Sequence, residues 1–160
     1  MADGYARASG RFGAVLGIGG PGLCNMATAV AAAKTDAAPL LVLSGEVPVA
    51  MEGLGEFQDA SQATLDDTAV MKPLTRLSMT AVSASNLNHW LRHALTAMWA
   101  HPRGPVHLSL TRDVLTGECA ADYVSVSPFF AGIEPLSVPQ ARAVLSGLAP
   151  AADTGSPQRI

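Results

Sequence analysis

Gly13-Ala-Val-Leu-Gly-Ile-Gly-Gly-Pro-Gly-Leu-Cys-Asn25 is the stretch that decides the fold of this 160-residue chain. Its first half, Gly13 to Gly19, is short and apolar without alternation, which is typical of a strand covered on both faces in a parallel sheet. A glycine turn, Gly19-Gly-Pro-Gly22, follows it, and the alanine-rich residues 23–36 carry apolar side chains at helical spacing. Strand, turn and helix in this order predict the first part of a βαβ unit.

The residues after this helix complete the unit. Pro39 opens a second apolar run, Leu40-Leu-Val-Leu-Ser44, which is predicted to be a buried strand. The glycine-containing residues 49–59 predict a loop, residues 61–71 a helix, and residues 75–82 a short strand.

The clearest element is an amphipathic helix. Its apolar residues recur at i, i+3, i+4 and i+7 over three turns: Leu87, Trp90, Leu91, Ala94, Leu95, Met98 and Trp99. Ser83 or Ser85 is predicted as its N-cap, and Pro102 with Gly104 is predicted to close it. Residues 105–110 then alternate apolar with polar side chains, which predicts a more exposed strand.

Strands that alternate with helices predict an α/β fold built on a mostly parallel, doubly wound sheet. We expect this domain to occupy residues 1–115. Residues 116–139 contain several glycines and prolines with little periodicity, which indicates a linker, and residues 140–160 are predicted to start a second domain.

Composition argues against several classes of protein. With 49% hydrophobic and 14% charged residues, the chain can bury one sizeable core. Its 13 acidic and 10 basic residues are scattered, which argues against a nucleic-acid or membrane surface. No apolar run reaches the roughly 20 residues that span a bilayer. Cys24 and Cys119 lack nearby ligand partners and the first residues do not resemble a signal peptide, so we expect free, mostly buried thiols, no metal site and a cytoplasmic protein.

Ligands of open α/β sheets collect beyond the carboxyl ends of the strands, and two predicted loops lie there. In the first, residues 19–25, glycines let the backbone approach a ligand, and free amides at the helix start favour an anion or a ring acceptor. A tight turn without a ligand explains the composition equally well. Neither a P-loop nor a complete dinucleotide fingerprint is present, because Pro21 lies inside the turn.

The second loop, residues 45–59, contains Phe57 and Gln58, an aromatic side chain and an amide that could line a pocket. An anchored surface loop is the simpler alternative. Other polar residues are interpreted in the simplest way: Glu46, Glu52 and Glu56 as solvated carboxylates, and His89 and His93 as part of an exposed helix face without a third metal ligand.

Five segments of the chain together carry a family resemblance: Ala2-Asp-Gly-Tyr-Ala-Arg7, Gly19-Gly-Pro-Gly-Leu-Cys-Asn25, residues 36–48, Glu56-Phe-Gln-Asp59 and Arg103-Gly-Pro-Val-His-Leu108. In this order they closely resemble the N-terminal domain of thiamine-diphosphate enzymes related to acetolactate synthase large subunits. The resemblance runs from Met1 to about Val114. It implies the pyrimidine-type domain of the thiamine-diphosphate-binding fold.

The resemblance implies that thiamine diphosphate is held between two subunits, with its aminopyrimidine on this domain and its diphosphate with Mg2+ on a C-terminal domain of the partner. Gly20, Pro21, Gly22 and Asn25 match the loop beside the pyrimidine, and Phe57 and Gln58 match the pair that faces the reacting carbon and the substrate. It also implies decarboxylation and carboligation of 2-keto acids, a transferase or lyase activity, by a homodimer or homotetramer. Whether FAD is bound depends on a middle domain and stays open.

In such enzymes a glutamate bonds the pyrimidine ring and promotes its imino form. It lies about two helical turns before the segment that matches Met1 to Tyr5, so we expect it upstream of Met1 and no catalytic residue in this chain. We also expect the family's first strand to be missing, which would expose a sheet edge and favour aggregation. A chain of this kind is expected neither to bind the cofactor tightly nor to turn over.

Two alternatives stay open. The chain could be a non-catalytic or split-subunit module that pairs with a separately encoded chain. It could also be an unrelated flavodoxin-like nucleotide binder, although that reading leaves Phe57 and Gln58 unexplained.

Overall fold

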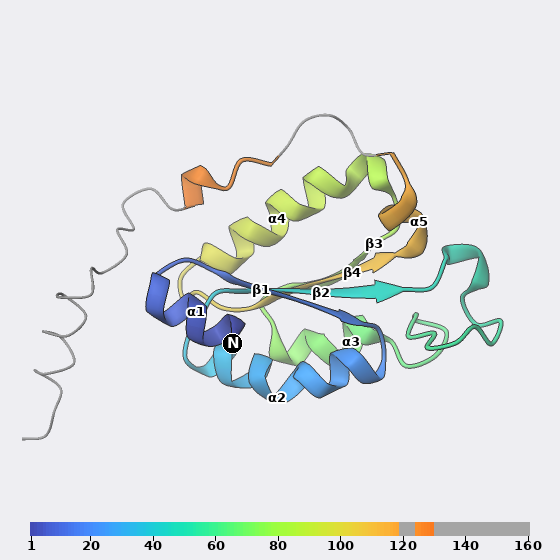
Figure 1. The fold of residues 1–160 in the computed structure, drawn as a ribbon, viewed down its shortest axis with the longest axis horizontal. Coiled ribbons are helices and arrows are strands. Elements are labelled where there is room, and N and C mark those ends of the chain that lie inside the picture. The colour runs from blue at the N-terminus through green and yellow to red at the C-terminus, as the bar shows by residue number, and fades with distance from the viewer. Residues whose placement is uncertain (119–123, 130–160) are drawn as a thin grey trace, which may run out of the picture.

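The computed structural model describes residues 1–118 and 124–129 and contains a parallel sheet with helices on both faces (Figure 1). Its strands are β1 (Gly13–Ile18), β2 (Leu40–Glu46), β3 (Ser78–Ala81) and β4 (Val106–Thr111), in the order β1-β2-β4-β3. The helices are α1 (Ala2–Ser9), α2 (Pro21–Thr35), α3 (Asp67–Met71), α4 (Leu87–Trp99) and α5 (Arg112–Thr116), and all three strand pairs are parallel. The predicted α/β class is confirmed.

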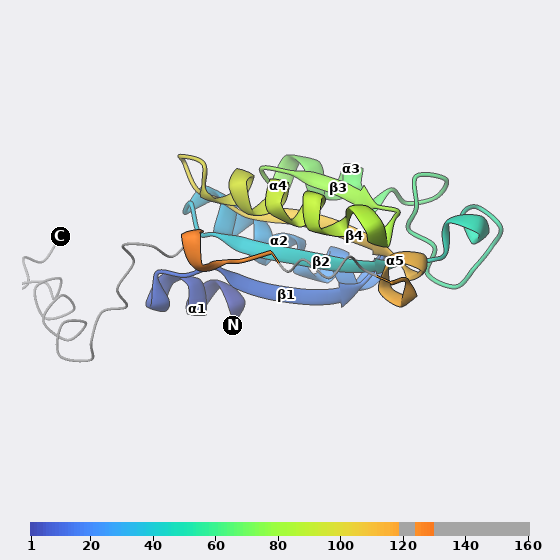
Figure 2. The same cartoon turned by 90° about the horizontal axis from the view of Figure 1, so that it is seen from above.

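Each face of the sheet buries its own apolar cluster. On one face α1, α2 and α3 pack over a cluster that includes Leu23, Val30 and Val42. On the other face α4 packs over a cluster that includes Leu95 and Leu108 (Figure 2). Each fully buried side chain of this size contributes ~1.5–3 kcal/mol, so both clusters stabilise the sheet.

The strand order reverses between β2 and β4, and this reversal marks where a ligand is expected. The chain passes from β1 to β2 through α2 on one face, and returns from β3 to β4 through α4 on the other. Glu46 and Thr111 are register partners at the carboxyl ends of these two central strands. Ligands of doubly wound sheets bind outside the carboxyl ends of the strands at such a switch point.

Two predicted helix details are wrong because local turn chemistry intervenes. The helix predicted over 61–71 is only α3, because the amides of Thr64 and Asp66 both donate to the Ser61 carbonyl and form turns instead. Asp66 then caps α3 by accepting the Ala69 amide. At α4 the N-cap is Asn86, whereas the hydroxyls of Ser83 and Ser85 bond each other at 2.8 Å.

The prediction of an exposed strand at 105–110 is also wrong. All six residues of β4 are buried, because the strand lies between β2 and β3 with helices on both faces. The alternating side chains of β4 point to two different buried surroundings. Leu108 and Leu110 face α4. The polar side chains face the other side of the sheet and are also buried: His107, Ser109 and Thr111. The polar side chains therefore belong to the interior.

β1 was predicted to be covered on both faces, and this prediction is wrong as well. Within the described residues β1 is an edge strand, with 69% of Leu16 and 52% of Ile18 exposed. Figure 2 shows the reason: α4 lies over β3 and β4 and leaves this side of β1 open. The expected exposed sheet edge and apolar face are therefore present in the described residues.

Replacing Leu16 by lysine is expected to reduce self-association of the chain, because a charge on an open apolar edge strand disfavours edge-to-edge pairing. Light scattering across a concentration series would measure the change. Leu54→Lys is the control, since Leu54 is equally exposed but lies in a loop. Unchanged association of Leu16→Lys, or an equal effect of both variants, would contradict the expectation.

The predicted linker is described only at 116–118 and 124–129, and the predicted second domain at 140–160 lies outside the described residues. Val124 and Phe129 pack against the cluster beneath α4. Among the helices of the described segments, none combines the length and apolar character that crossing a membrane requires.

Candidate functional site

The glycine turn and the loop after β2 meet at the carboxyl edge of the sheet. The Gly19 amide donates to the Gly45 carbonyl at 2.8 Å. A Cβ at Gly19 would lie 2.8 Å from that carbonyl oxygen and 3.2 Å from a carboxylate oxygen of Asp67. Only glycine permits this approach, so the two predicted ligand loops are fixed to one another.

Gly20 turns the chain into α2 through a positive φ of 65° and donates its amide to the Asp67 carboxylate at 3.1 and 3.2 Å. Amides at this helix start were expected to be free for a ligand, but the Gly20 amide already has a partner. Asp67 is 1% exposed. Burial raises the pKa of this carboxyl to about 6 and the negative charge of Glu46 adds to the rise, while the Gly20 amide opposes it.

Phe57 and Gln58 line a cavity of about 190 Å3 at the switch point. The other lining residues are Ile18, Gly45, Glu46, Val47, Arg112 and Leu115. Phe57 is 84% exposed, although aromatic side chains are usually buried, and Gln58 has a positive φ of 57°. The aromatic and the amide predicted as a pair therefore line one cavity, beside the carboxyl ends of β1 and β2.

Side chains on either side of this pair hold its loop in place. The Asp59 carboxylate accepts the Gly53 amide at 2.6 Å and the Ser61 amide at 3.0 Å. The Ser61 side chain is the main cause that lowers the pKa of Asp59, and these two amides add to it. The Val49 amide donates to the carboxylate of Asp113 in α5 at 2.8 Å. The loop is anchored at both ends while Phe57 stays exposed.

The predicted cofactor-binding residues divide between two places. Gly22 supports the Phe57 cavity, because a Cβ there would lie 2.7 Å from Ile18, which lines that cavity. Asn25 lines a different cavity of about 240 Å3, formed with Met1, Val15 and Met26. Asn25 and Phe57 therefore do not line the same cavity.

Glu46 was interpreted as a solvated carboxylate, and this is wrong. Only 7% of it is exposed, and its Oε1 accepts the amides of Val47 at 2.8 Å and Ala60 at 3.1 Å. It lines both the Phe57 cavity and a larger one of about 470 Å3. Its position directly after a buried apolar strand was the available signal. Glu52 and Glu56 are partly exposed, as expected, and Glu56 lies 4.0 Å from Arg112.

His107 and Asp67 were not predicted as site residues. His107 is fully buried between two hydroxyls, with Nε2 2.9 Å from Ser44 and Nδ1 2.9 Å from Ser78. Burial lowers its pKa to about 4, so the ring is neutral near pH 7. The alternation at 105–110 does not by itself distinguish a buried histidine from an exposed one, so the sequence offered no signal for this contact.

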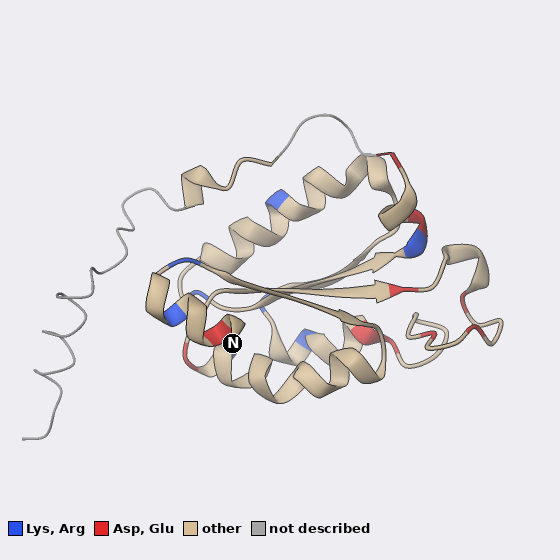
Figure 3. Ribbon diagram, in the orientation of Figure 1, with Lys and Arg blue, Asp and Glu red and all other residues tan. Residues whose placement is uncertain are grey.

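Acidic residues dominate the neighbourhood of the site. Figure 3 shows them at the carboxyl end of β2, at the start of α3 and in the loop between. Across the described ranges, no three His, Cys, Asp or Glu side chains are grouped so that they could hold a metal ion. His89 and His93 lie exposed on α4, as expected. The thiol of Cys24 was expected to be buried, and this is wrong, because Cys24 lies on an exposed position of α2.

Comparison with known proteins gives a consistent picture. Residues 1–70 match the family model described as thiamine pyrophosphate enzyme, N-terminal TPP binding domain. The chain is 41% identical over 115 residues to a putative acetolactate synthase large subunit of Mycobacterium tuberculosis, which covers 72% of this chain and 21% of that protein. It is 38% identical over 123 residues to a probable 2-ketoarginine decarboxylase of Pseudomonas aeruginosa, covering 77% and 22%.

A third relative is the acetolactate synthase isozyme 3 large subunit of Escherichia coli, 34% identical over 124 residues, covering 78% of this chain and 21% of that protein. The chain therefore spans about a fifth of the length of the curated relatives it matches.

Proposed function

Because this chain carries the N-terminal thiamine-pyrophosphate-binding domain of an acetolactate-synthase-like enzyme, we propose that it supplies the aminopyrimidine side of a cofactor site for 2-keto acid chemistry. The observation that carries the proposal is the junction of Gly19 with Gly45 at the strand ends. This bond joins the glycine turn, matched to the pyrimidine loop, to the loop of Phe57 and Gln58, matched to the substrate side. Both lie where doubly wound sheets bind ligands.

The residues present fit the ring half of the cofactor. The backbone at Gly20 is less crowded than at Gly19, where the Gly45 carbonyl fills the space: a Cβ at Gly20 would meet only Ala60 at 3.7 Å and Leu65 at 4.0 Å. Phe57 offers an exposed aromatic face above a cavity, which suits a ring or an apolar part of a substrate. Bound thiamine diphosphate would supply the carbon nucleophile and the electron sink for decarboxylating a 2-keto acid.

The remaining parts of the proposal follow from the resemblance. The pyrimidine is held by Gly20, Pro21, Gly22 and Asn25, and the 2-keto acid is oriented by Phe57 and Gln58. The activating glutamate and the residues that hold the diphosphate and Mg2+ lie outside this chain. The working enzyme is a cytoplasmic homodimer or homotetramer that performs decarboxylation and carboligation, and the 160 residues alone do not turn over. Similarity to an acetolactate synthase and to a decarboxylase supports the 2-keto acid class.

Gln58→Asn in the enzyme that contains this domain is expected to lower kcat/KM for a 2-keto acid by about tenfold to a hundredfold, because a hydrogen bond to a charged group contributes ~1.5–3 kcal/mol. Asparagine tolerates the positive φ at this position, and the change shortens the amide by one methylene. Steady-state consumption of pyruvate is the measurement.

Gln62→Asn is the matched control, since Gln62 is exposed and does not line the Phe57 cavity. We expect it to leave kcat/KM unchanged. If Gln58→Asn stays within about twofold of the parent enzyme, a difference of only ~0.4 kcal/mol, the proposed role of Gln58 fails.

A further inference from the structure

The cavity of about 470 Å3 lies on the α3 side of the sheet, next to the smaller Phe57 cavity, and the proposed function does not use it. Glu46 lines both cavities, so they adjoin at this side chain. One wall of the larger cavity is formed by β3 and the residue that follows it, through Ser78, Thr80 and Val82. Cavities of this volume can hold a small organic ligand.

The charged groups of the larger cavity are all acidic. Glu46 and Glu52 line it together with serine and threonine hydroxyls, and no lysine, arginine or histidine is among its lining residues. No basic residue lies between Glu46 and Lys72 in the sequence. Among the described residues, no ion pair involves Glu46 or Glu52. The cavity therefore carries negative charge that the described part of the chain does not neutralise.

The burial of Glu46 is a separate reason to expect a positively charged ligand. Only 7% of this residue is exposed, and the two amides that it accepts, from Val47 and Ala60, both bond to Oε1. Its Oε2 has no hydrogen-bond donor among the described residues. Buried charges are normally paired, because an isolated charge removed from water is strongly destabilising. Oε2 is therefore free to meet a cation in the cavity.

Unpaired hydroxyls on the central strand β4 give a further indication. Thr111 is the register partner of Glu46, and Ser109 is that of Thr80. Register partners in a parallel sheet point to the same face, so both hydroxyls lie on the face that carries the cavity. Both side chains are buried, and neither hydroxyl has a hydrogen-bond partner within the described residues. Because buried hydroxyls are normally paired, they favour a polar occupant on this face.

The lining of the larger cavity suits an organic cation better than a metal ion. Over residues 1–118 and 124–129, no three His, Cys, Asp or Glu side chains are grouped so that they could hold a metal. An ammonium has three N–H donors and a guanidinium has five, which matches two carboxylates surrounded by hydroxyls. Charge-assisted hydrogen bonds of this kind are about twice as strong as neutral ones.

The Phe57 cavity contains a basic residue, which the larger cavity lacks. Arg112 lines it beside Phe57 and Gln58. Its contact with Glu56 is long, at 4.0 Å, and 61% of the Arg112 side chain is exposed, so the guanidinium can also meet a ligand. Two adjoining cavities of opposite charge match a molecule with a carboxylate at one end and a cation at the other.

We propose that the larger cavity is a subsite for the positively charged side chain of a 2-keto acid, an ammonium or guanidinium held by Glu46 and Glu52. The carboxylate and keto group of the same molecule lie in the Phe57 cavity near Arg112. This subsite deepens the proposed function by naming its substrate class, and it rests on that function for the reaction. The binding of the cation does not depend on it.

The test is a titration of the isotope-labelled 160-residue chain with propylguanidinium and with propylammonium at constant ionic strength, followed by amide chemical shifts. We expect saturable shifts at residues 46–52 and 78–82, with half-saturation at about 1–10 mM, as for a weakly bound fragment. Propylurea has the shape of propylguanidinium without its charge and should bind at least about tenfold more weakly. Equal binding of propylurea, or no shift at these amides with either cation, would overturn the proposal.

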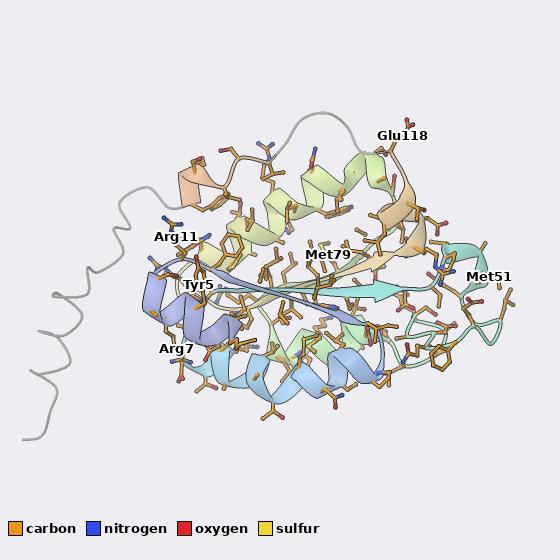
Figure 4. All side chains as sticks on the ribbon, viewed as in Figure 1. Tyr5, Arg7, Arg11, Met51, Met79 and Glu118 are labelled. Carbon is orange, nitrogen blue, oxygen red and sulfur yellow. The ribbon has the colours of Figure 1, made fainter. Side chains whose placement is uncertain are left out.

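Three variants sharpen the titration. In Glu46→Gln the amide keeps an oxygen for Val47 and Ala60 and places an NH2 group where Oε2 meets the cation, so binding should weaken about tenfold to a hundredfold. Glu52→Gln should weaken it about twofold to fivefold, because Glu52 is partly exposed. Glu118→Gln removes an exposed carboxylate on the α4 side of the sheet (Figure 4) and should leave binding unchanged. An equal loss in all three variants would indicate attraction by net charge alone and overturn the subsite.

A second measurement separates the subsite from the proposed function. In the enzyme that contains this domain, a 2-keto acid that carries a guanidinium on a short aliphatic chain is compared with pyruvate. We expect Glu52→Gln to lower the ratio of their kcat/KM values, cationic substrate over pyruvate, by about twofold to fivefold. An unchanged ratio would overturn the subsite while the proposed function stands. If the enzyme consumes neither 2-keto acid, the proposed function fails, and the titration of the chain alone decides the subsite.

Discussion

His107→Ala is expected to lower the free energy of unfolding by about 3–4 kcal/mol, the cost of deleting a large buried side chain from a core. The ring is fully buried on the central strand β4, between hydroxyls from the two strands that flank it. Alanine would leave a cavity there and remove both hydrogen bonds. Denaturant unfolding at neutral pH is the measurement.

His93→Ala is the matched control for this variant. His93 is exposed on α4, so its loss is expected to change the free energy of unfolding by no more than about 0.5 kcal/mol. The average cost of a point substitution is about 1 kcal/mol. A smaller loss for His107→Ala would show that the hydrogen bonds of His107 to Ser44 and Ser78 do not hold the strands together.

Gly19→Ala is the second change with a large expected effect. The added methyl would press on the Gly45 carbonyl at 2.8 Å, a backbone atom in a buried strand that cannot move aside. Overpacking costs about 1–3 kcal/mol and the strained Gly19–Gly45 hydrogen bond adds about 1 kcal/mol, so we expect a loss of about 2–4 kcal/mol. The turn would also separate from the Phe57 loop.

Thermal unfolding of Gly19→Ala and Gly4→Ala side by side measures this effect. Gly4 lies in α1 with no atom near a prospective Cβ, so alanine there is expected to be neutral or stabilising by up to about 1 kcal/mol. Equal stability of the two variants would contradict the close approach of the two loops. In the enzyme that contains this domain, we also expect Gly19→Ala to bind the cofactor at least about tenfold more weakly, a change of ~1.4 kcal/mol.

Local pattern was sufficient for the βαβ unit. The run Gly13 to Asn25 predicts β1 and the start of α2, and α4 begins and ends where its apolar spacing begins and ends. Such elements are determined by residues close in the sequence, so a single chain suffices to predict them. The class of fold followed directly from their order.

Elsewhere, contacts between distant residues decided the outcome. Alternation at 105–110 does not distinguish a strand whose polar side chains face water from one whose polar side chains are buried. Only the hydrogen bonds of His107 with Ser44 and Ser78 show that these side chains are buried. The helix predicted at 61–71 fails for a local reason instead, because the amides of Thr64 and Asp66 donate to the Ser61 carbonyl and form turns.

At the candidate site, too, some features follow from local sequence and others depend on contacts between separate segments. The loops at 19–25 and 45–59 follow from the strand-end rule, whereas the role of Phe57 and Gln58 beside the substrate follows only from the family resemblance. Glu46 was misread because its burial depends on an amide of Ala60, fourteen residues away. A carboxylate anchored by a distant loop leaves no local pattern in the sequence.

The central claim is that the glycine turn and the Phe57 loop form the pyrimidine side of a thiamine-diphosphate site. Titrating the isotope-labelled chain with thiamine diphosphate while recording amide chemical shifts tests it most directly, and weak binding is enough for this readout. We expect the changes to concentrate at the amides of residues 19–25 and 56–58. Changes confined to other parts of the chain, or none at these amides as the cofactor nears saturation, would contradict the claim.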